Sequence, residues 1–452
     1  MCKIGRIWLA CVLIICITGC TVQRTPMDLM RAPQPSLEQS NLHQSALRLL
    51  PQGTKLAVPK KMETGMSAII EQDLNGDTKP EAIVFFRKEP ESYEFGYMIL
   101  EQSVKDSQVS WKRVFEEHVP SRDIDFVKFV DLAGDGNPKL VTGWSGGNRD
   151  KNEIHVTAWA ADGGYQSLTP LTYSAAAIDD LDNDGIAEIV VMQRDEVKRE
   201  ASASLYRYQK EQIQLASKLR IDGGFEGYDQ VEIAPVAAGI KGVFVHAGMG
   251  AHSSISWLLK LDDEGNLVDV LNEDPIKPTW MNPKPVLSTD LNGDGYFEVD
   301  RMLEPLQAEN IPMFAMPWIH ELYQWSPEKG MIPVLRTYLD MENGFRLDFP
   351  MRWDKRMTLV KDEEKPSILH FSVVQNEMLK EDVFRVEVVP IKDVAIQHEK
   401  WRAQGAQWVS IGEIGSVSVQ IVYTISPQKQ PKAIRDLLPT PEEWAALLHP
   451  LK

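Results

Sequence analysis

A short acidic motif recurs four times in the middle of the chain, and its spacing limits the folds that this sequence can adopt. The copies are DLNGDTKPEAIV, DLAGDGNPKLVT, DLDNDGIAEIVV and DLNGDGYFEVDR, which begin at Asp73, Asp131, Asp180 and Asp290. Their starts are 58, 49 and 110 residues apart, and the last interval is twice 55. A unit is therefore expected midway, and residues 231–248 there keep the strand, turn and strand pattern without the acids. Five units thus extend from about residue 67 to residue 339.

Each unit offers four short runs with the residue pattern of β-strands. In the third unit the runs are SAAAID, EIVVMQR, SASLYRY and QIQLASKLR, and the last two alternate apolar and polar residues. Four antiparallel strands in a unit of about 40 to 55 residues, repeated around an axis, are typical of propeller blades. The pattern predicts a mainly β fold, with about five blades of a β-propeller over residues 61–340. A stacked solenoid is the alternative, and a sixth blade built from the two chain ends also stays open.

The acidic loops place oxygen donors at alternate positions of a tight turn, followed by an acid at the ninth position. Hard cations such as Ca²⁺ take about six to eight oxygen ligands, which side chains at alternate positions of a curled backbone can supply. Glycine at the sixth position permits the bend. We expect complete donor sets in the first, third and fifth units: Asp73, Asn75, Asp77 and Glu81; Asp180, Asp182, Asp184 and Glu188; and Asp290, Asn292, Asp294 and Glu298.

The second loop is expected to bind metal only weakly. It retains Asp131 and Asp135, but Ala133 and Lys139 replace two of the oxygen donors. The ammonium group of Lys139 could instead occupy the position of the cation. Acidic turns that hold no metal are the alternative for all four loops.

An EF-hand loop opens with the same pattern, but it requires a bidentate glutamate at position twelve between two helices. Here the acid at position nine leads into apolar and β-branched residues, IAEIVV in the third unit and YFEVDR in the fifth. The units resemble the FG-GAP or VCBS repeats of integrin-like propellers, whose calcium loop joins the first two strands of a blade. This resemblance covers about 270 residues and implies a structural Ca²⁺ ion in each complete loop. The Phe-Gly and Gly-Ala-Pro signatures of integrins are missing, and most such domains have seven blades.

The first 19 residues read as a lipoprotein signal peptide. Lys3 and Arg6 precede an apolar run over residues 7–17, which is too short to cross a hydrocarbon core of about 30 Å. The run ends in ITGC, which resembles the lipobox of bacterial lipoproteins and implies lipidation of Cys20 and anchoring at the extracytoplasmic face of the cell membrane. All four cysteines lie in this segment, so we expect an exported domain without disulfides. An ordinary secretory signal is the alternative.

The chain on either side of the repeats differs in composition. Residues 20–60 are rich in Gln, Ser and Pro and predict a tether, with one weak helix over residues 37–50. Packing of this helix on the folded body is the alternative. Residues 341–452 contain strand patterns such as GFRLDFPMRW and SILHFSVVQ, and an amphipathic helix at DVAIQHEKWRAQG. A short second helix begins at Pro441 after a Thr440 cap. This segment is therefore expected to be a small α+β domain.

The balance of charge limits the kinds of partner that the chain is expected to bind. The chain has 48 Lys and Arg against 65 Asp and Glu, a net charge of -17, which makes nucleic acid an unexpected partner. We expect a non-enzymatic lipoprotein whose propeller binds an envelope glycan or a protein partner. The alternative is an envelope polysaccharide hydrolase with paired carboxylates in the propeller channel. Convergence of acids outside the loops, such as Asp123, Asp125 or Glu232, would favour the hydrolase.

Overall fold

The computed structural model describes residues 37–62, 65, 67–88, 94–105, 108–146, 151–250, 252–306, 308, 311–313, 315–362, 364–365, 367–375 and 378–451. The predicted signal peptide over 1–19 and the predicted lipidation site Cys20 lie outside the described residues. The chain forms two compact units. The first unit contains Met1–Val58, Ser67–Gln72 and Lys79–His118, and the second contains Pro59–Met66, Asp73–Thr78 and Val119–Lys452.

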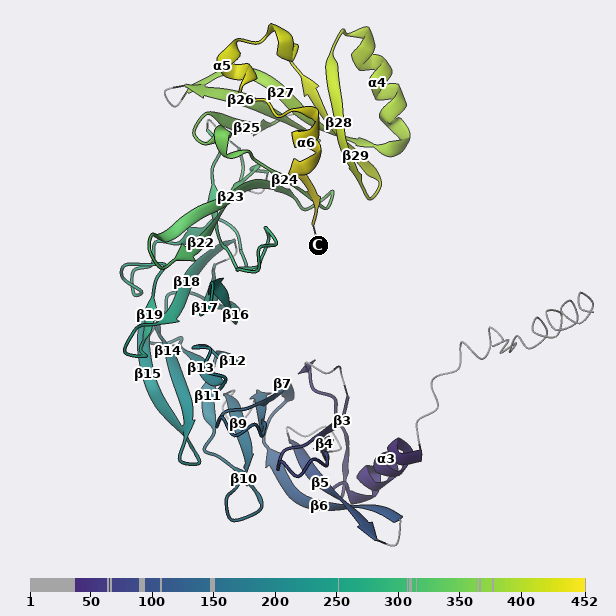
Figure 1. The fold of residues 1–452 in the computed structure, drawn as a ribbon, viewed down its shortest axis with the longest axis vertical. Coiled ribbons are helices and arrows are strands. Elements are labelled where there is room, and N and C mark those ends of the chain that lie inside the picture. Colours follow the sequence, from purple (N-terminus) through teal and green to yellow (C-terminus); the bar gives the residue numbers. More distant parts are fainter. Residues whose placement is uncertain are drawn as a thin grey trace, which may run out of the picture. The chain divides into compact units, whose positions relative to one another are not determined.

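The first unit is one five-stranded sheet with a helix packed against it (Figure 1). Its strands are β1 (Thr54–Leu56), β3 (Ile69–Gln72), β4 (Glu81–Lys88), β5 (Phe95–Lys105) and β6 (Gln108–Val119), in the order β1-β4-β5-β6 with β3 also on β4. Helix α3 (Leu37–Leu49) buries Leu42 and Ala46 in a core with Val84, Met98 and Trp111. The described part of the segment expected as a tether, residues 37–60, therefore contributes a helix and a strand to this unit.

The second unit contains five further sheets, and the first three of them account for the second, third and fourth repeats (Figure 1). The second sheet contains β2 (Lys61–Met62), β7 (Asp123–Val130), β8 (Lys139–Ser145), β9 (Asn152–Trp159), β10 (Tyr165–Ser167) and β11 (Leu171–Tyr173). The third contains β12 (Ala175–Asp179), β13 (Glu188–Asp195), β14 (Glu200–Gln209) and β15 (Gln212–Asp222). The fourth contains β16 (Gly227–Ala237), β17 (Ile240–Met249), β18 (Ser253–Leu261), β19 (Leu267–Asp269) and β20 (Met281–Asn282).

The last two sheets hold the fifth repeat and the C-terminal domain. The fifth sheet has the order β21 (Val299–Leu303), β22 (Ile319–Ser326), β23 (Gly330–Asp340), β24 (Phe345–Asp348) and β30 (Leu448–Pro450). The C-terminal sheet has the order β25 (Met357–Lys361), β26 (Ile368–Gln375), β27 (Met378–Pro390), β29 (Val417–Tyr423) and β28 (Gln407–Ile414). The expectation of a mainly β fold built from several antiparallel sheets is confirmed, and the four strands of the third repeat lie where the sequence predicts them.

Neighbouring sheets of the second unit share hydrophobic cores, and strands such as β8 and β13 are buried on both faces. In β13, Ile189 and Val191 pack with residues of the second sheet, whereas Val190 and Met192 pack with the fourth sheet. Val299 of β21 joins Phe244 of the fourth sheet in another core. A continuous apolar run such as EIVVM is what a strand covered on both sides requires.

The C-terminal domain is inserted into the fifth sheet. β24 pairs with β23, and the last strand, β30, returns to pair with β24. Between them lie the C-terminal sheet and helices α4 (Val394–Ala403), α5 (Lys432–Arg435) and α6 (Pro441–Leu447). Thr440 caps α6 as predicted, through a hydrogen bond from the backbone N–H of Glu443 at 3.2 Å. The expected boundary at residue 341 thus falls between two paired strands, and the domain limits stay predictions.

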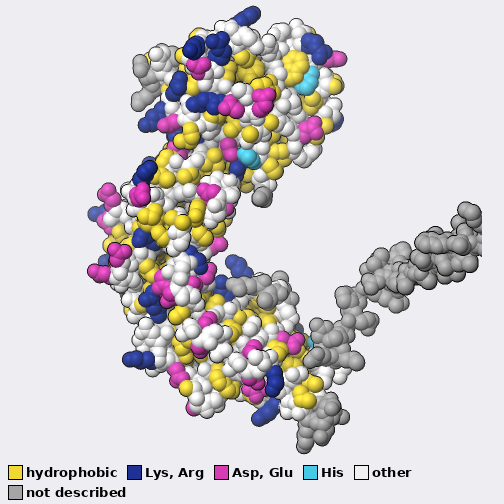
Figure 2. All heavy atoms as spheres, viewed as in Figure 1, with side chains coloured by type: hydrophobic (Ala, Val, Ile, Leu, Met, Phe, Trp, Pro, Cys, Tyr) yellow, Lys and Arg dark blue, Asp and Glu magenta, His cyan; other side chains and the backbone are white. Residues whose placement is uncertain are grey.

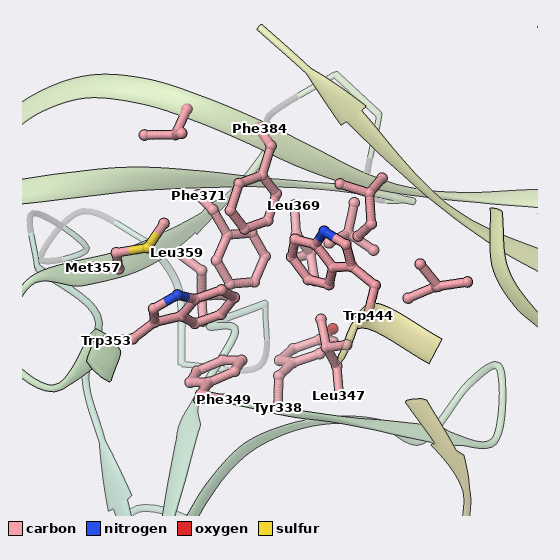
Figure 3. Packing of buried hydrophobic residues seen from close by; sticks show 14 of the residues in the cluster. Tyr338, Leu347, Phe349, Trp353, Met357, Leu359, Leu369, Phe371, Phe384 and Trp444 are labelled. Carbon is pink, nitrogen blue, oxygen red and sulfur yellow. The ribbon is translucent and has the colours of Figure 1, made fainter. Parts of the chain in front are cut away.

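An aromatic cluster fills the core of this domain, and Figure 3 shows its side chains converging. Phe371 and Phe384 stack with ring centroids 4.8 Å apart, and Trp444 of α6 meets Phe384 edge-on at 5.0 Å. The Nε1–H group of Trp444, which is buried, donates to the hydroxyl of Tyr423 at 3.0 Å. Tyr338 of the fifth sheet belongs to the same core, so the inserted domain and the fifth sheet pack together.

The surface carries mixed charge. In Figure 2, Lys and Arg side chains lie between Asp and Glu side chains over the visible face. Within the part of the chain that the structure describes, no helix is both long and apolar enough to cross a membrane.

Candidate metal centre

Each acidic loop leads into a strand, and the strands after the first three loops are buried on both faces. The first three loops join β3 to β4, β7 to β8 and β12 to β13, and the loop of the fifth repeat precedes β21. In every loop the first aspartate accepts a hydrogen bond from the backbone N–H of the sixth residue. These bonds measure 2.8 Å at Asp73, 2.7 Å at Asp131, 3.0 Å at Asp180 and 2.9 Å at Asp290. The four loops therefore curl in the same way.

The sixth residue adopts a left-handed backbone in all four loops. Its φ is +77° at Gly136, +88° at Gly185 and +93° at Gly295, where glycine accepts this conformation without strain. At Thr78 in the first loop φ is +68°, which a β-branched residue adopts at an energetic cost. The glycine expected from the sequence is thus required by the backbone, and its replacement strains the first loop.

Two loops gather three carboxylates around one point. Oxygens of Asp180, Asp182 and Asp184 all lie within 4.8 Å of one another, and so do oxygens of Asp290, Asp294 and Glu298. Asn292 adds an amide oxygen beside the second group, and its Nδ2 donates to Asp294 at 3.0 Å. Carboxylate and amide oxygens are the donors that Ca²⁺ prefers, so both groups fit a hard cation.

The ninth-position glutamates are buried at the start of the following strand. Glu188 and Glu298 are each 2% exposed, and each accepts the backbone N–H of the second loop residue, Leu181 at 2.9 Å and Leu291 at 2.8 Å. Burial, aided by neighbouring loop aspartates, raises the pKa of each glutamate to about 7. A bound divalent cation would favour the ionised form and reverse this shift.

In the second loop a lysine takes the place of the ninth-position acid. The ammonium of Lys139 donates to both carboxylate oxygens of Asp135 at 3.1 Å and to the carbonyl of Asn137 at 2.8 Å. The Lys139 side chain is only 4% exposed. This loop therefore carries a covalently attached cation at the point where its oxygens converge, as the substitution predicts.

The third loop is approached by a guanidinium that sequence spacing alone does not indicate. Arg207 lies on β14, where the pairing of Ile189 with Tyr206 brings it beside the start of β13. Its Nη2 donates to Asp182 at 2.6 Å and its Nε to Glu188 at 3.2 Å. This positive charge competes with a metal ion for two of the four expected donors.

The equivalent position of the fifth sheet holds a neutral amide. The pairing of Val299 with Tyr323 places Gln324 beside the fifth loop. Its Nε2 donates to the two carboxylate oxygens of Asp294 at 3.0 and 2.8 Å, and to Glu298 at 2.9 Å. A half-turn of the amide would present its carbonyl oxygen instead, so Gln324 can become a ligand. The fifth loop thus has the most favourable donor set among the described loops.

The donors of the first loop fall in both compact units. Asp73, Asn75 and Asp77 belong to the second unit and Glu81 to the first. The backbone N–H of Gly76 donates to Asp73 at 2.7 Å, and that of Asp77 donates to Asn75 at 2.9 Å. Glu81 is 2% exposed at the start of β4.

The acids outside the loops are held by neighbouring donors. Asp125 accepts hydrogen bonds from the hydroxyls of Ser145 at 2.6 Å and Tyr173 at 2.8 Å. Lys60 forms ion pairs with both Asp123 at 2.9 Å and Asp125 at 3.4 Å. Glu232 accepts a hydrogen bond from Gln230 at 2.8 Å on an exposed face. The structure thus brings Asp123 and Asp125 to one ammonium group, which neutralises part of their charge, and gives Glu232 a separate partner.

Comparisons with known proteins add little. No family model matches the chain, and no curated protein matches it. Among solved structures the chain is similar to Sqt1 of Chaetomium thermophilum, solved bound to the N-terminus of the ribosomal protein L10, with 12% identity and a TM-score of 0.29. The match covers 64% of this chain and 78% of the other. A similarity of this size carries no argument about function.

Proposed function

We propose that this chain is a non-enzymatic lipoprotein, anchored through Cys20 at the extracytoplasmic face of the cell membrane. In this proposal the five repeat sheets are the blades of a calcium-stabilised β-propeller, which binds an envelope glycan or a protein partner. The C-terminal α+β domain is inserted into its last blade.

The fifth loop carries this proposal. Asp290, Asp294 and Glu298 converge there beside two side-chain amides, and no Lys or Arg among the described residues neutralises them through an ion pair. When bound, Ca²⁺ would supply positive charge to a loop that faces a buried strand. The ion would be held by Asp290, Asn292, Asp294 and Glu298. A second, more weakly bound ion would be held by Asp180, Asp182, Asp184 and Glu188. The role of the ion would be structural, because the fifth loop leads into β21, whose Val299 is buried in a core with the fourth sheet.

The test of calcium binding is isothermal titration of the chelator-treated protein with CaCl₂. We expect saturable binding that Asp294→Ala removes from the tightest site. Asp135→Ala is the matched control, because it removes the equivalent aspartate from the loop that holds Lys139. Equal titration curves for the wild type and Asp294→Ala would contradict the proposed ion site.

The test of partner binding is affinity capture from detergent-solubilised envelopes, with calcium and with chelator. A specific envelope component recovered in calcium and reduced in chelator would support the proposal. Recovery of the same background proteins as an empty matrix, in both conditions, would count against it.

A further inference from the structure

A groove of about 640 Å³ lies beside β28, the outermost strand of the C-terminal sheet. Its lining comes from residues 406–409, where β28 begins, from Tyr423 of β29, and from the chain on either side of α5, at residues 427–428, Arg435 and residues 438–441. Ligand sites commonly enclose about 300 to 1,000 Å³. The groove is therefore large enough for a short stretch of peptide.

The groove is lined from both faces of the sheet. Trp408 belongs to the face that α4 covers, where its ring lies 5.8 Å from that of Trp401. Val409 belongs to the opposite face, where it packs against the aromatic core. Successive side chains of a strand point to opposite faces, so a groove that is lined by both opens on the edge between them.

The backbone along this edge is available for pairing. In the described part of the chain β28 pairs with β29 alone, and no other hydrogen bond reaches the backbone of residues 407–410. Alternate N–H and C=O groups of an edge strand point away from the sheet and can pair with an added strand. The stretch QWVS that begins β28 carries none of the charges or prolines that commonly protect such edges.

The chain around α5 is held in place before any ligand binds. The Nε1–H group of Trp353 donates to the carbonyl of Leu437 at 2.8 Å, and Nε of Arg352 donates to the same oxygen at 3.1 Å. Proline, whose φ is fixed, stands at three positions of the lining: Pro427, Pro439 and Pro441. A lining that is already ordered loses little conformational entropy when a ligand binds.

Arg435 determines the charge that the groove favours. It is exposed, it is the one charged residue in the described lining, and its guanidinium has no ion pair among the described residues. The exposed charges that flank the lining in the sequence balance each other, with Lys429 and Lys432 against Asp436 and Glu442. A guanidinium in this situation favours an occupant that carries a carboxylate.

We propose that β28 binds an extended peptide segment of a partner protein, which adds a strand to the C-terminal sheet and places a carboxylate beside Arg435. Backbone hydrogen bonds to residues 407–410 give affinity, and alternate side chains of the peptide contact Trp408 on one face and Val409 on the other. A second copy of β28 would bring only the uncharged stretch QWVS to the groove. The site lies outside the repeat sheets, so it does not depend on the function proposed for the propeller.

The probe for this site is the peptide acetyl-SVEVTVS-amide, titrated with the full chain in detergent micelles and followed by ligand-observed NMR, with micelles alone as the blank. Its valines favour an extended backbone, and its glutamate supplies the carboxylate. We expect saturable binding that weakens about tenfold when lysine replaces the glutamate. The same peptide methylated on its backbone nitrogens cannot donate to an edge strand, so it should not bind. A peptide that does not bind, or whose methylated form binds equally well, would overturn the proposal.

An exchange of charge places the peptide beside Arg435. Arg435→Glu should reverse the preference, so that the lysine peptide binds about tenfold more tightly than the glutamate peptide. Lys432→Glu is the matched control, because it makes the same change on the same short helix but outside the lining, and it should keep the preference of the wild type. Both side chains are exposed, so both variants should fold. If Arg435→Glu also keeps the wild-type preference, the peptide binds elsewhere and the assignment is wrong.

The oligomeric state distinguishes a partner peptide from a second copy of this chain. Sedimentation velocity of the full chain should give the same mass for the wild type and for Arg435→Glu, with and without the probe peptide. A dimer that the probe peptide dissociates would show that β28 pairs with its counterpart in a second copy, and would refute the assignment to a partner protein.

Discussion

One side chain faces the third loop and another faces the fifth loop. Swapping these two side chains should also swap the calcium affinities of the two loops. Arg207 lies beside the third loop and Gln324 beside the fifth, at equivalent positions of their strands. Arg207→Gln should therefore strengthen the third site, and Gln324→Arg should weaken the fifth. The two variants change one charge each in opposite directions and serve as controls for one another.

The magnitude follows from the position of the guanidinium. The side chain of Arg207 is 32% exposed, so we use the dielectric constant of water. A unit charge about 5 Å from a divalent ion then opposes its binding by about 1.7 kcal/mol, which is about a tenfold to twentyfold change in Kd. If the unopposed loop has a Kd near 0.1 mM, about 1 mM calcium stabilises the fold by about 1.4 kcal/mol, and the opposed loop by about 0.3 kcal/mol.

The assay combines calcium titration with thermal melting in calcium and in chelator. For each protein the measured quantity is the difference between the melting temperatures in calcium and in chelator. This difference should be about 2 °C larger for Arg207→Gln than for the wild type. In chelator alone it should melt below the wild type, because buried Glu188 loses its hydrogen-bonded partner. If both variants bind calcium as the wild type does, the guanidinium does not compete for the loop and the reasoning fails.

Three further outcomes test the loops and the anchor. Asp294→Ala should lower the melting temperature by about 2 °C in calcium and have little effect in chelator. The control variant Asp135→Ala should change the melting temperature equally in both conditions. An equal effect of Asp294→Ala in calcium and in chelator would count against bound metal. Burial raises the pKa of Glu188 and Glu298 from 4.5 to about 7, so the folded chain holds these protons more tightly than the unfolded chain. Their contribution to stability in chelator should be complete below about pH 4.5 and lost as the pH rises through about 7, and calcium should remove this decline; melting curves that fall equally with and without calcium would contradict it. Cys20→Ser should leave the membrane fraction or fail to mature, and a mutant that fractionates as the wild type does would contradict lipidation.

The repeats could be predicted because their signal is local. In the third unit the apolar run of β13 and the alternation in β14 and β15 give strands within a few residues of their observed limits. The acidic loop fixes the turn, since Gly185 takes the left-handed conformation that its position requires. The ion pair of Lys139 with its own loop could likewise be predicted, because the lysine and the oxygens that it binds belong to the same short segment.

The features that sequence reasoning missed depend on pairing between distant segments. Arg207 and Gln324 reach their loops from the next strand, and only the strand register shows that they are equivalent. The weak pattern of helix α3 left open whether it packs on the body, and the partners of Leu42 and Ala46 decide that it packs on the first sheet.

The insertion of the C-terminal domain has a mechanical consequence. The chain enters this domain after β24 and leaves it at β30, and these two strands are hydrogen-bonded neighbours in one sheet. A domain joined at one end is usually released by a single cut in its linker. Here a protease that cleaves between β23 and β24 would not release the domain. The fragment stays bound through the pairing of β24 with β23 and through the shared aromatic core.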